Sequence, residues 1–138
     1  MKKHRMLVSC VLVILALYLA EAAAVGGYLR HMVQSSYRGY GEENPFTDSV
    51  SDESYQQMCV RNGYSVSSRE DPALRETKTL IGPLAYHWFV GGKAIYWYTY
   101  QIYDEDGTLA GGSARVPVTV SYTFSDGKLL ITDYQEAP

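Results

Sequence analysis

Side chains able to carry out acid–base, nucleophilic or metal chemistry are few in this sequence. Its 138 residues include three histidines and two cysteines. His4 and Cys10 lie within the first ten residues, which leaves His31, His87 and Cys59 for a site elsewhere. These three have no Cys/His spacing typical of structural zinc. His87 would act as a general base only beside a nucleophile, and the sequence indicates none.

Two short segments resemble functional motifs without satisfying them. Gly112-Ser113-Ala114 is not a nucleophile elbow, which requires G-x-S-x-G on a strand-to-helix turn. An EF-hand loop beginning at Asp104 needs a bidentate Glu at its twelfth position, where the sequence has Arg115. We therefore expect a non-enzymatic protein without a metal site or a cofactor.

Aromatic residues are the unusual feature of the composition, with 13 Tyr, 2 Trp and 3 Phe. Flat rings with polar groups suit the binding of glycans, peptides and proteins. Tyr96, Tyr98 and Tyr100 alternate onto one face of a predicted strand, and Trp97 and Tyr103 onto the other. One short helix cannot cover both faces, so some ring surface should be exposed or covered by the preceding segment. The predicted ligand-binding residues are Trp88, Tyr96, Trp97, Tyr98, Tyr100 and Tyr103.

A purely structural role for these rings is the alternative, because aromatic residues favour strands and pair across them. Replacing Trp97 and Tyr100 by Ala separates the two interpretations. Loss of partner capture with an intact fold would indicate a binding face. Loss of folding would indicate a structural role.

The strands that position the rings follow from periodicity and turn signals. From Leu80 onward apolar residues recur with a period of two, which is typical of strands. Gly91-Gly92, Asp106-Gly107 and Asp126-Gly127 each suit a tight hairpin, where positive φ is required. The predicted strands cover about 80–90, 93–103, 108–124 and 128–135.

A short helix is predicted before the strands, over about 52–62. Ser49 or Ser51 suits its N-cap. Its apolar face is formed by Tyr55, Met58 and Cys59. This spacing favours burial of Cys59 over an intermolecular bridge. We predict an α+β fold, a short N-terminal helix followed by a four-stranded antiparallel meander sheet, in the element order of a cystatin-like roll. The helix is expected to cover the apolar face of the sheet.

The N-terminus has the features of an export segment. A basic head, Lys2–Arg5, precedes an apolar run, Met6–Ala20, and small residues follow up to Ala24. The run is shorter than the ~20 residues that cross a bilayer, but a helix continuing to Leu29 would span. A signal peptide cleaved after about Ala24 and an uncleaved anchor are both consistent with this pattern. In either case the basic head places the rest of the chain outside.

Three segments organise the chain. Residues 1–24 are the signal peptide or membrane anchor, residues 25–47 a tether rich in Gly, Ser and Tyr, and residues 48–138 a single α+β domain. An ordered strap is the alternative for residues 25–47, where Leu29, Met32 and Val33 could form one or two helical turns. The net charge of −3 argues against a nucleic-acid partner, since nucleic-acid-binding domains usually carry a basic face.

The C-terminal part carries a recognisable pattern. Gly111-Gly112-Ser113 precedes a Val-rich strand at 116–120, and the chain ends in an aromatic-acidic-proline sequence. From Tyr86 to Pro138 the sequence resembles small extracytoplasmic domains of Gram-positive bacteria, including the tail domain of β-lactam-sensor-like membrane proteins. The metalloprotease motif H-E-x-x-H of such proteins is absent from the sequence. The resemblance implies an accessory sensing or binding module.

These observations predict a non-catalytic bacterial module, either secreted or anchored by a single N-terminal transmembrane helix. Its partner would be a cell-envelope glycan or protein, recognised through the aromatic-rich sheet, and the membrane itself if the N-terminal segment is uncleaved. The alternative is a small regulator or inhibitor of an envelope enzyme such as a protease. A glycan would be captured in the first case, and a stable protein complex would form in the second.

Overall fold

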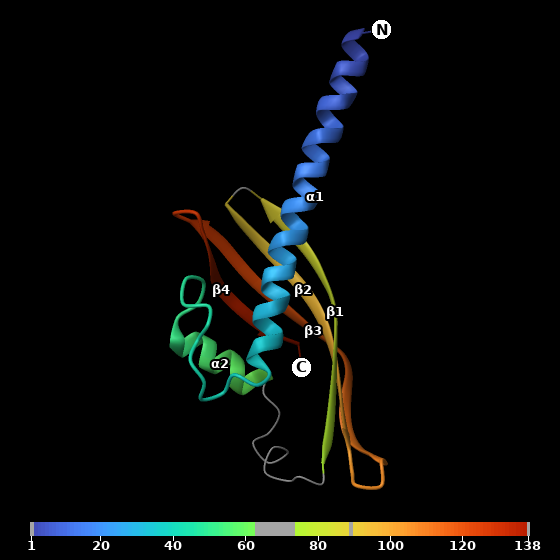
Figure 1. Cartoon of the computed structure of the whole chain (residues 1–138), viewed down its shortest axis with the longest axis vertical. Coiled ribbons are helices and arrows are strands. Elements are labelled where there is room, and N and C mark those ends of the chain that lie inside the picture. Colours follow the sequence, from blue (N-terminus) through green and yellow to red (C-terminus); the bar gives the residue numbers. More distant parts are fainter. Residues whose placement is uncertain (1, 63–73, 89, 138) are drawn as a thin grey trace.

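A long helix, a short helix and one antiparallel sheet make up the fold. The computed structural model describes residues 2–62, 74–88 and 90–137, without the side chains of residues 2, 76 and 83–88. The elements are α1 (Lys2–Ser36), α2 (Asp52–Asn62), β1 (Arg75–Trp88), β2 (Gly91–Tyr103), β3 (Leu109–Ser125) and β4 (Lys128–Glu136). The strands are ordered β1-β2-β3-β4, and α1 crosses one face of the sheet and projects beyond it (Figure 1). The predicted α+β meander is confirmed.

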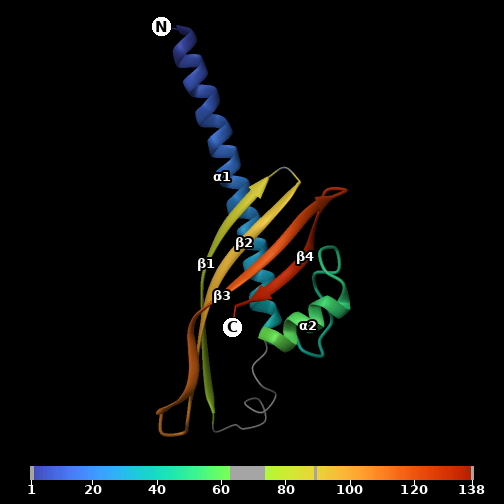
Figure 2. The ribbon, with the colours of Figure 1, turned by 180° about the vertical axis from the view of Figure 1, so that it is seen from behind.

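The helix that begins the fold is long, which corrects the predicted short N-terminal helix. α1 comprises 35 residues, and its N-terminal half projects away from the sheet while its C-terminal half lies against it (Figures 1 and 2). Val25, Leu29 and Val33 are buried in the main core. They lie at i, i+4 and i+8, so they form one stripe on the helix. Residues 25–36, predicted as part of a tether, therefore belong to the helix that covers the sheet.

The main core lies between α1 and the inner face of the sheet, which is the face toward α1. Val118 and Val120 of β3 and Tyr96 of β2 are at most 1 % exposed and belong to the same cluster as the α1 stripe. Buried and accessible residues alternate along β2 and β3, so the outer face of the sheet is accessible to solvent. The apolar face is thus covered by α1, whereas the sequence predicted that the helix at 52–62 would cover it.

α2 has the predicted position and buried face. It begins after Ser51, whose Oγ accepts a hydrogen bond from the backbone N–H of Ser54 at 3.2 Å, as an N-cap does. Its buried residues are Tyr55, Met58, Cys59 and Asn62. Tyr55, Met58 and Cys59 form a second cluster with Met32 of α1, against which Ile131 of β4 packs. The predicted burial of Cys59 is confirmed, because its side chain is fully inaccessible.

The structure confirms one of the predicted hairpin turns and corrects another. Asp126 and Gly127 have φ of 52° and 75°, the left-handed pair that a two-residue hairpin requires. Gly91 and Gly92, predicted as a turn, instead begin β2 and pair with β3. β1 starts at Arg75, about five residues before the predicted boundary. Hydrophobic alternation located the centres of the strands better than their ends.

Polar contacts fasten α1 to β1. The guanidinium of Arg30 donates to the backbone carbonyls of Leu80, at 2.9 Å, and Gly82. The β1–β2 register shifts between Ile81 and Leu84, and Gly82 has a φ of 109°. Two carbonyls at this irregularity are therefore satisfied by one side chain of the helix.

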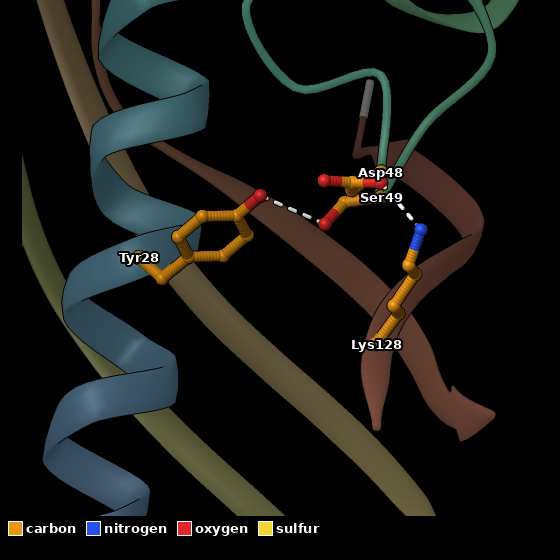
Figure 3. A network of polar contacts seen from close by, with 4 residues as sticks. All are labelled: Tyr28, Asp48, Ser49 and Lys128. Atoms are coloured by element: carbon orange, nitrogen blue, oxygen red, sulfur yellow. Dashed lines mark hydrogen bonds and ion pairs between the residues drawn. The ribbon is translucent and has the colours of Figure 1, made fainter. Parts of the chain in front are cut away.

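The segment before α2 fastens α1 to β4, as Figure 3 shows. The Tyr28 hydroxyl lies 2.7 Å from Ser49 Oγ, and Lys128 Nζ forms an ion pair with Asp48 at 2.6 Å. The Ser49 carbonyl accepts a hydrogen bond of 2.8 Å from the N–H of Ile131 in β4. β4 is an edge strand of the sheet, and this contact occupies part of its free edge.

Candidate functional site

The structure divides the predicted binding residues between the two faces of the sheet. Tyr96 is fully buried and Tyr98 is 8 % exposed, both on the inner face beneath α1. Tyr100 is partly buried against the same core. Trp97 and Tyr103 alternate onto the outer face and keep part of their surface accessible. This burial agrees with the predicted separation into two faces, and among the described side chains Trp97 and Tyr103 lie away from the core cluster.

Tyr96 links the core of the sheet to the helix. Its hydroxyl donates to the backbone carbonyl of Gly26 at 3.1 Å, which places the bond where α1 begins to pack. Burial raises the pKa of Tyr96 well above its ordinary value. A neutral, hydrogen-bonded phenol inside the core has no access to a ligand, so Tyr96 is a structural residue.

Tyr98 belongs to a partly buried polar group at the C-terminal end of α1. Its hydroxyl donates to the carboxylate of Glu136, and its ring stacks on that of Tyr100 with centroids 6.2 Å apart. Burial first, and then the bond to Glu136, raise the pKa of Tyr98. Nearby, the Tyr134 hydroxyl bonds to Asn62 Oδ1, and Asn62 Nδ2 donates to Ser36 Oγ at 2.7 Å. This group joins α1, α2 and β4 through satisfied hydrogen bonds.

Trp97, a predicted binding residue, lies in an accessible apolar row that crosses the outer face of the sheet. Ile81 of β1 pairs with Trp97 of β2, and Trp97 pairs with Pro117 of β3. Ile81 is 52 % exposed, and Pro117 is also exposed. We call these three residues the outer row. Among the described residues, no helix lies over this face of the sheet (Figure 2).

Polar strand residues and Ile95 lie around the outer row. Thr99 and Gln101 follow Trp97 on the same face of β2, and Tyr103 ends this side of the strand. The Tyr103 hydroxyl donates to Gln101 Oε1 at 3.0 Å. Thr119 of β3 lies beside Pro117 on this face, opposite Ile95. Protein interfaces commonly combine an apolar centre with a polar rim.

The last predicted residue, Trp88, ends β1, where it pairs with Gly91. Its side chain lies outside the described residues, as does that of His87. His31 is exposed on α1, with its ring 5.5 Å from that of Phe46. Within the described ranges, no group of three or more His, Cys, Asp or Glu residues could hold a metal ion.

A cavity of about 220 Å³ between α2 and β4 was not predicted from the sequence. Met58 and Ile131 give it an apolar wall, and Arg61 and Asp133 lie at its polar side. Arg61 is already engaged, because it donates to the Tyr134 carbonyl at 3.0 Å. Small-molecule sites usually measure about 300 to 1,000 Å³, so this cavity is small for a ligand site. Its lining comes from two segments far apart in sequence, and no local motif marks it.

The N-terminal half of α1 is the second accessible apolar surface. Its exposed large residues run from Met6 to Leu19, with Leu7, Leu12, Ile14 and Leu17 each about 60 % exposed or more. The helix is long and apolar enough to cross a membrane, which is consistent with a signal sequence or a single anchor.

No protein-family model, curated protein or solved structure matches this chain.

Proposed function

We propose that this chain is a membrane-anchored, non-catalytic module on the outside of a bacterial cell, and that it recognises an envelope component or a protein partner through the outer row. The observation that carries the proposal is the division of α1. One unbroken helix has an exposed apolar half and a half that is built into the core of the sheet.

The length of the exposed half supports an anchor. The ~19 residues from Met6 to Ala24 extend about 28 Å as a helix, close to the ~30 Å hydrocarbon thickness. Lys3 and Arg5 precede this stretch, which favours an N-terminus on the cytoplasmic side.

The packed half supports retention of the anchor. Cleavage after Ala24 would leave Val25, a core residue, at the new N-terminus. It would also leave Gly26, which accepts the Tyr96 hydroxyl bond, as the second residue. The predicted cleavage site lies inside a helix, whereas cleavage of a chain requires an extended segment at the site. Uncleaved anchoring is therefore the alternative that this fold favours.

Anchoring is tested by the mass of the chain and by its extraction from membranes. Full-length mass in the membrane fraction, resistant to alkaline carbonate, is expected. Replacing Leu12 and Leu15 with Arg should release the chain, since a central Arg costs about 2.5 to 3.5 kcal/mol on insertion. Gln34→Arg is the matched control, because Gln34 is exposed on the packed half of α1. Recovery from the medium of a chain lacking residues 1–24 would contradict the proposal.

Recognition through the outer row is tested with Trp97→Thr. Threonine favours strands, so this change removes the ring with little strain on β2. Gln135→Thr introduces the same side chain at an exposed position of β4 and serves as the control. We expect Trp97→Thr to abolish binding of isolated envelope polysaccharide and the control to retain it. A stable protein complex that depends on Trp97 would instead indicate a regulator of an envelope enzyme. Equal binding by both variants would exclude the outer row.

A further inference from the structure

One end of the sheet lies beside the projecting half of α1. The β1–β2 and β3–β4 hairpins both point toward the N-terminal side of the molecule, and the β2–β3 hairpin points the opposite way (Figures 1 and 2). Tyr122, near this end of β3, is close enough to Tyr18 and Glu21 for both to contribute, after burial, to a pKa raised to about 12. The sheet therefore extends along α1 past Val25, to the level where the apolar run ends.

The β1–β2 hairpin holds an apolar side chain outward at this end. Val90 is 74 % exposed. Its backbone carbonyl accepts hydrogen bonds from the N–H of Phe124, at 3.0 Å, and from Thr123 Oγ1, at 2.7 Å. The next residue, Gly91, has a φ of 151°, and a Cβ there would lie 2.4 Å from the Tyr122 carbonyl oxygen. The turn is thus fixed against β3 by its backbone, while the Val90 side chain makes none of these contacts.

The continuity of α1 sets the height of this hairpin above a membrane. No linker separates the exposed half of the helix from the packed half. If the hydrocarbon layer ends between Ala20 and Ala24, the hairpin beside Tyr18 and Glu21 lies at its boundary with the lipid headgroups. The opposite hairpin, which follows Tyr103 and carries Asp104, Glu105 and Asp106, is then at the far end of the sheet.

We propose that the β1–β2 hairpin inserts Val90 into the interfacial layer of the same membrane that α1 crosses. This inference rests on the proposed anchoring. A helix alone leaves the sheet free to rotate about the helix axis, and a second contact removes that freedom. The outer row would then face along the membrane surface in a fixed direction.

The composition of this end fits a headgroup layer. Trp88 precedes Val90 by two residues in the sequence, and Trp is enriched at membrane interfaces. Asp126 lies in the neighbouring β3–β4 turn, Lys128 follows that turn, and both are exposed. Charged side chains at that turn limit the depth of insertion, so we expect interfacial contact rather than burial in hydrocarbon.

Spin labels placed at three positions of the full chain test the inference. In a Cys10→Ser background, Leu15→Cys reports the anchor, Val90→Cys reports the hairpin, and Leu109→Cys is the matched control. Leu109 is 55 % exposed and starts β3 at the opposite end of the sheet. Cys59 is fully buried and should escape labelling. The chain is reconstituted into vesicles of phosphatidylcholine and phosphatidylglycerol.

The readout is the collision rate of each label with oxygen, which concentrates in lipid, relative to a water-soluble nickel complex. We expect this ratio to be highest at position 15, several-fold higher at position 90 than at position 109, and lowest at position 109. Circular dichroism of each labelled chain verifies the fold, and the exposure of Val90 predicts that labelling leaves it intact.

The two proposals fail differently in this experiment. A lipid-exposed label at position 15 with equal, water-like ratios at positions 90 and 109 would overturn the hairpin contact and keep the anchor. A high ratio at position 109 as well would mean that the sheet lies flat on the membrane, which also overturns it. A label at position 15 that collides mainly with the water-soluble nickel complex would overturn the anchoring and this inference together. A label there that collides with neither reagent, because a second copy of the chain covers it, would have the same consequence.

Discussion

Tyr96 and Trp97 are neighbours in β2, yet they belong to different environments. The Tyr96 side chain is fully buried beneath α1 and donates a hydrogen bond to that helix. Trp97 lies on the opposite face, between Ile81 and Pro117, where no described helix covers it. Strand alternation alone separates them. The comparison teaches that aromatic content marks a strand-rich core and a recognition surface equally, and that only the covering element distinguishes the two.

Truncating the two rings gives the largest expected contrast between the faces. Tyr96→Ala removes a core ring and should lower the free energy of unfolding by about 3 to 5 kcal/mol, as other aromatic-to-alanine changes in cores do. Trp97→Ala removes a partly exposed ring from the outer row and should cost on the order of 1 kcal/mol, mostly strand propensity and pair contacts.

Urea unfolding of the full chain in detergent, followed by circular dichroism, measures both changes. The wild-type chain sets the reference, and the same detergent is used throughout. Equal losses for Tyr96→Ala and Trp97→Ala would mean that the outer row also holds the fold together. That result would favour a structural role for the rings on both faces.

The second largest expected effect is a loss of stability at alkaline pH, caused by ionisation of the buried tyrosines. Burial raises the pKa of Tyr122 and of Tyr37 from the ordinary 10 to about 12. Because the folded pKa lies above the unfolded one, the stabilisation is fully present below pH 10 and is lost as pH rises toward 12. The free energy of unfolding should therefore fall across that interval.

The alkaline loss is measured by urea unfolding at a series of pH values, with phenolate absorbance as the second signal. Tyr122→Phe should make the fall with pH shallower, because one raised pKa is removed. An unchanged slope in this variant would show that Tyr122 ionises in the folded state without opposing burial.

Local signals predicted α2 well and α1 poorly. The cap at Ser51 and the stripe of Tyr55, Met58 and Cys59 lie within one short segment, so the sequence alone located the helix and its buried face. Gly26 and Gly27 and the Gly/Ser-rich sequence that follows lower helix propensity, so residues 25–36 resembled a tether. Packing on the sheet overrides that propensity. The signal available was the spacing of Val25, Leu29 and Val33.

The candidate site was predictable in part. Alternation correctly placed Trp97 opposite Tyr96, since it depends only on the period of a strand. Which face is open depends on where α1 packs, and no residue of β2 encodes this. The outer row also needs the register of three strands, which brings Ile81 and Pro117 to Trp97. Register depends on the turns and bulges between strands, and Gly91-Gly92, predicted as a turn, instead begins β2.

Removal of single hydroxyl groups gives the smallest and most specific contrast. Tyr96 and Tyr103 are both tyrosines of β2, and each hydroxyl donates one hydrogen bond. The Tyr96 bond to Gly26 is buried, so Tyr96→Phe leaves a carbonyl of α1 without this partner and should cost about 1 kcal/mol. Tyr103→Phe breaks a bond to Gln101 on the partly exposed outer face, where water replaces it, and should cost a few tenths of a kcal/mol at most.

Amide hydrogen exchange shows where each change acts. Tyr96→Phe should speed exchange in α1 around residues 25–30, because the bond ties that turn to the sheet, whereas Tyr103→Phe should leave it unchanged. Equal protection of α1 in both variants would mean that Val25, Leu29 and Val33 hold the helix on the sheet without the hydroxyl bond.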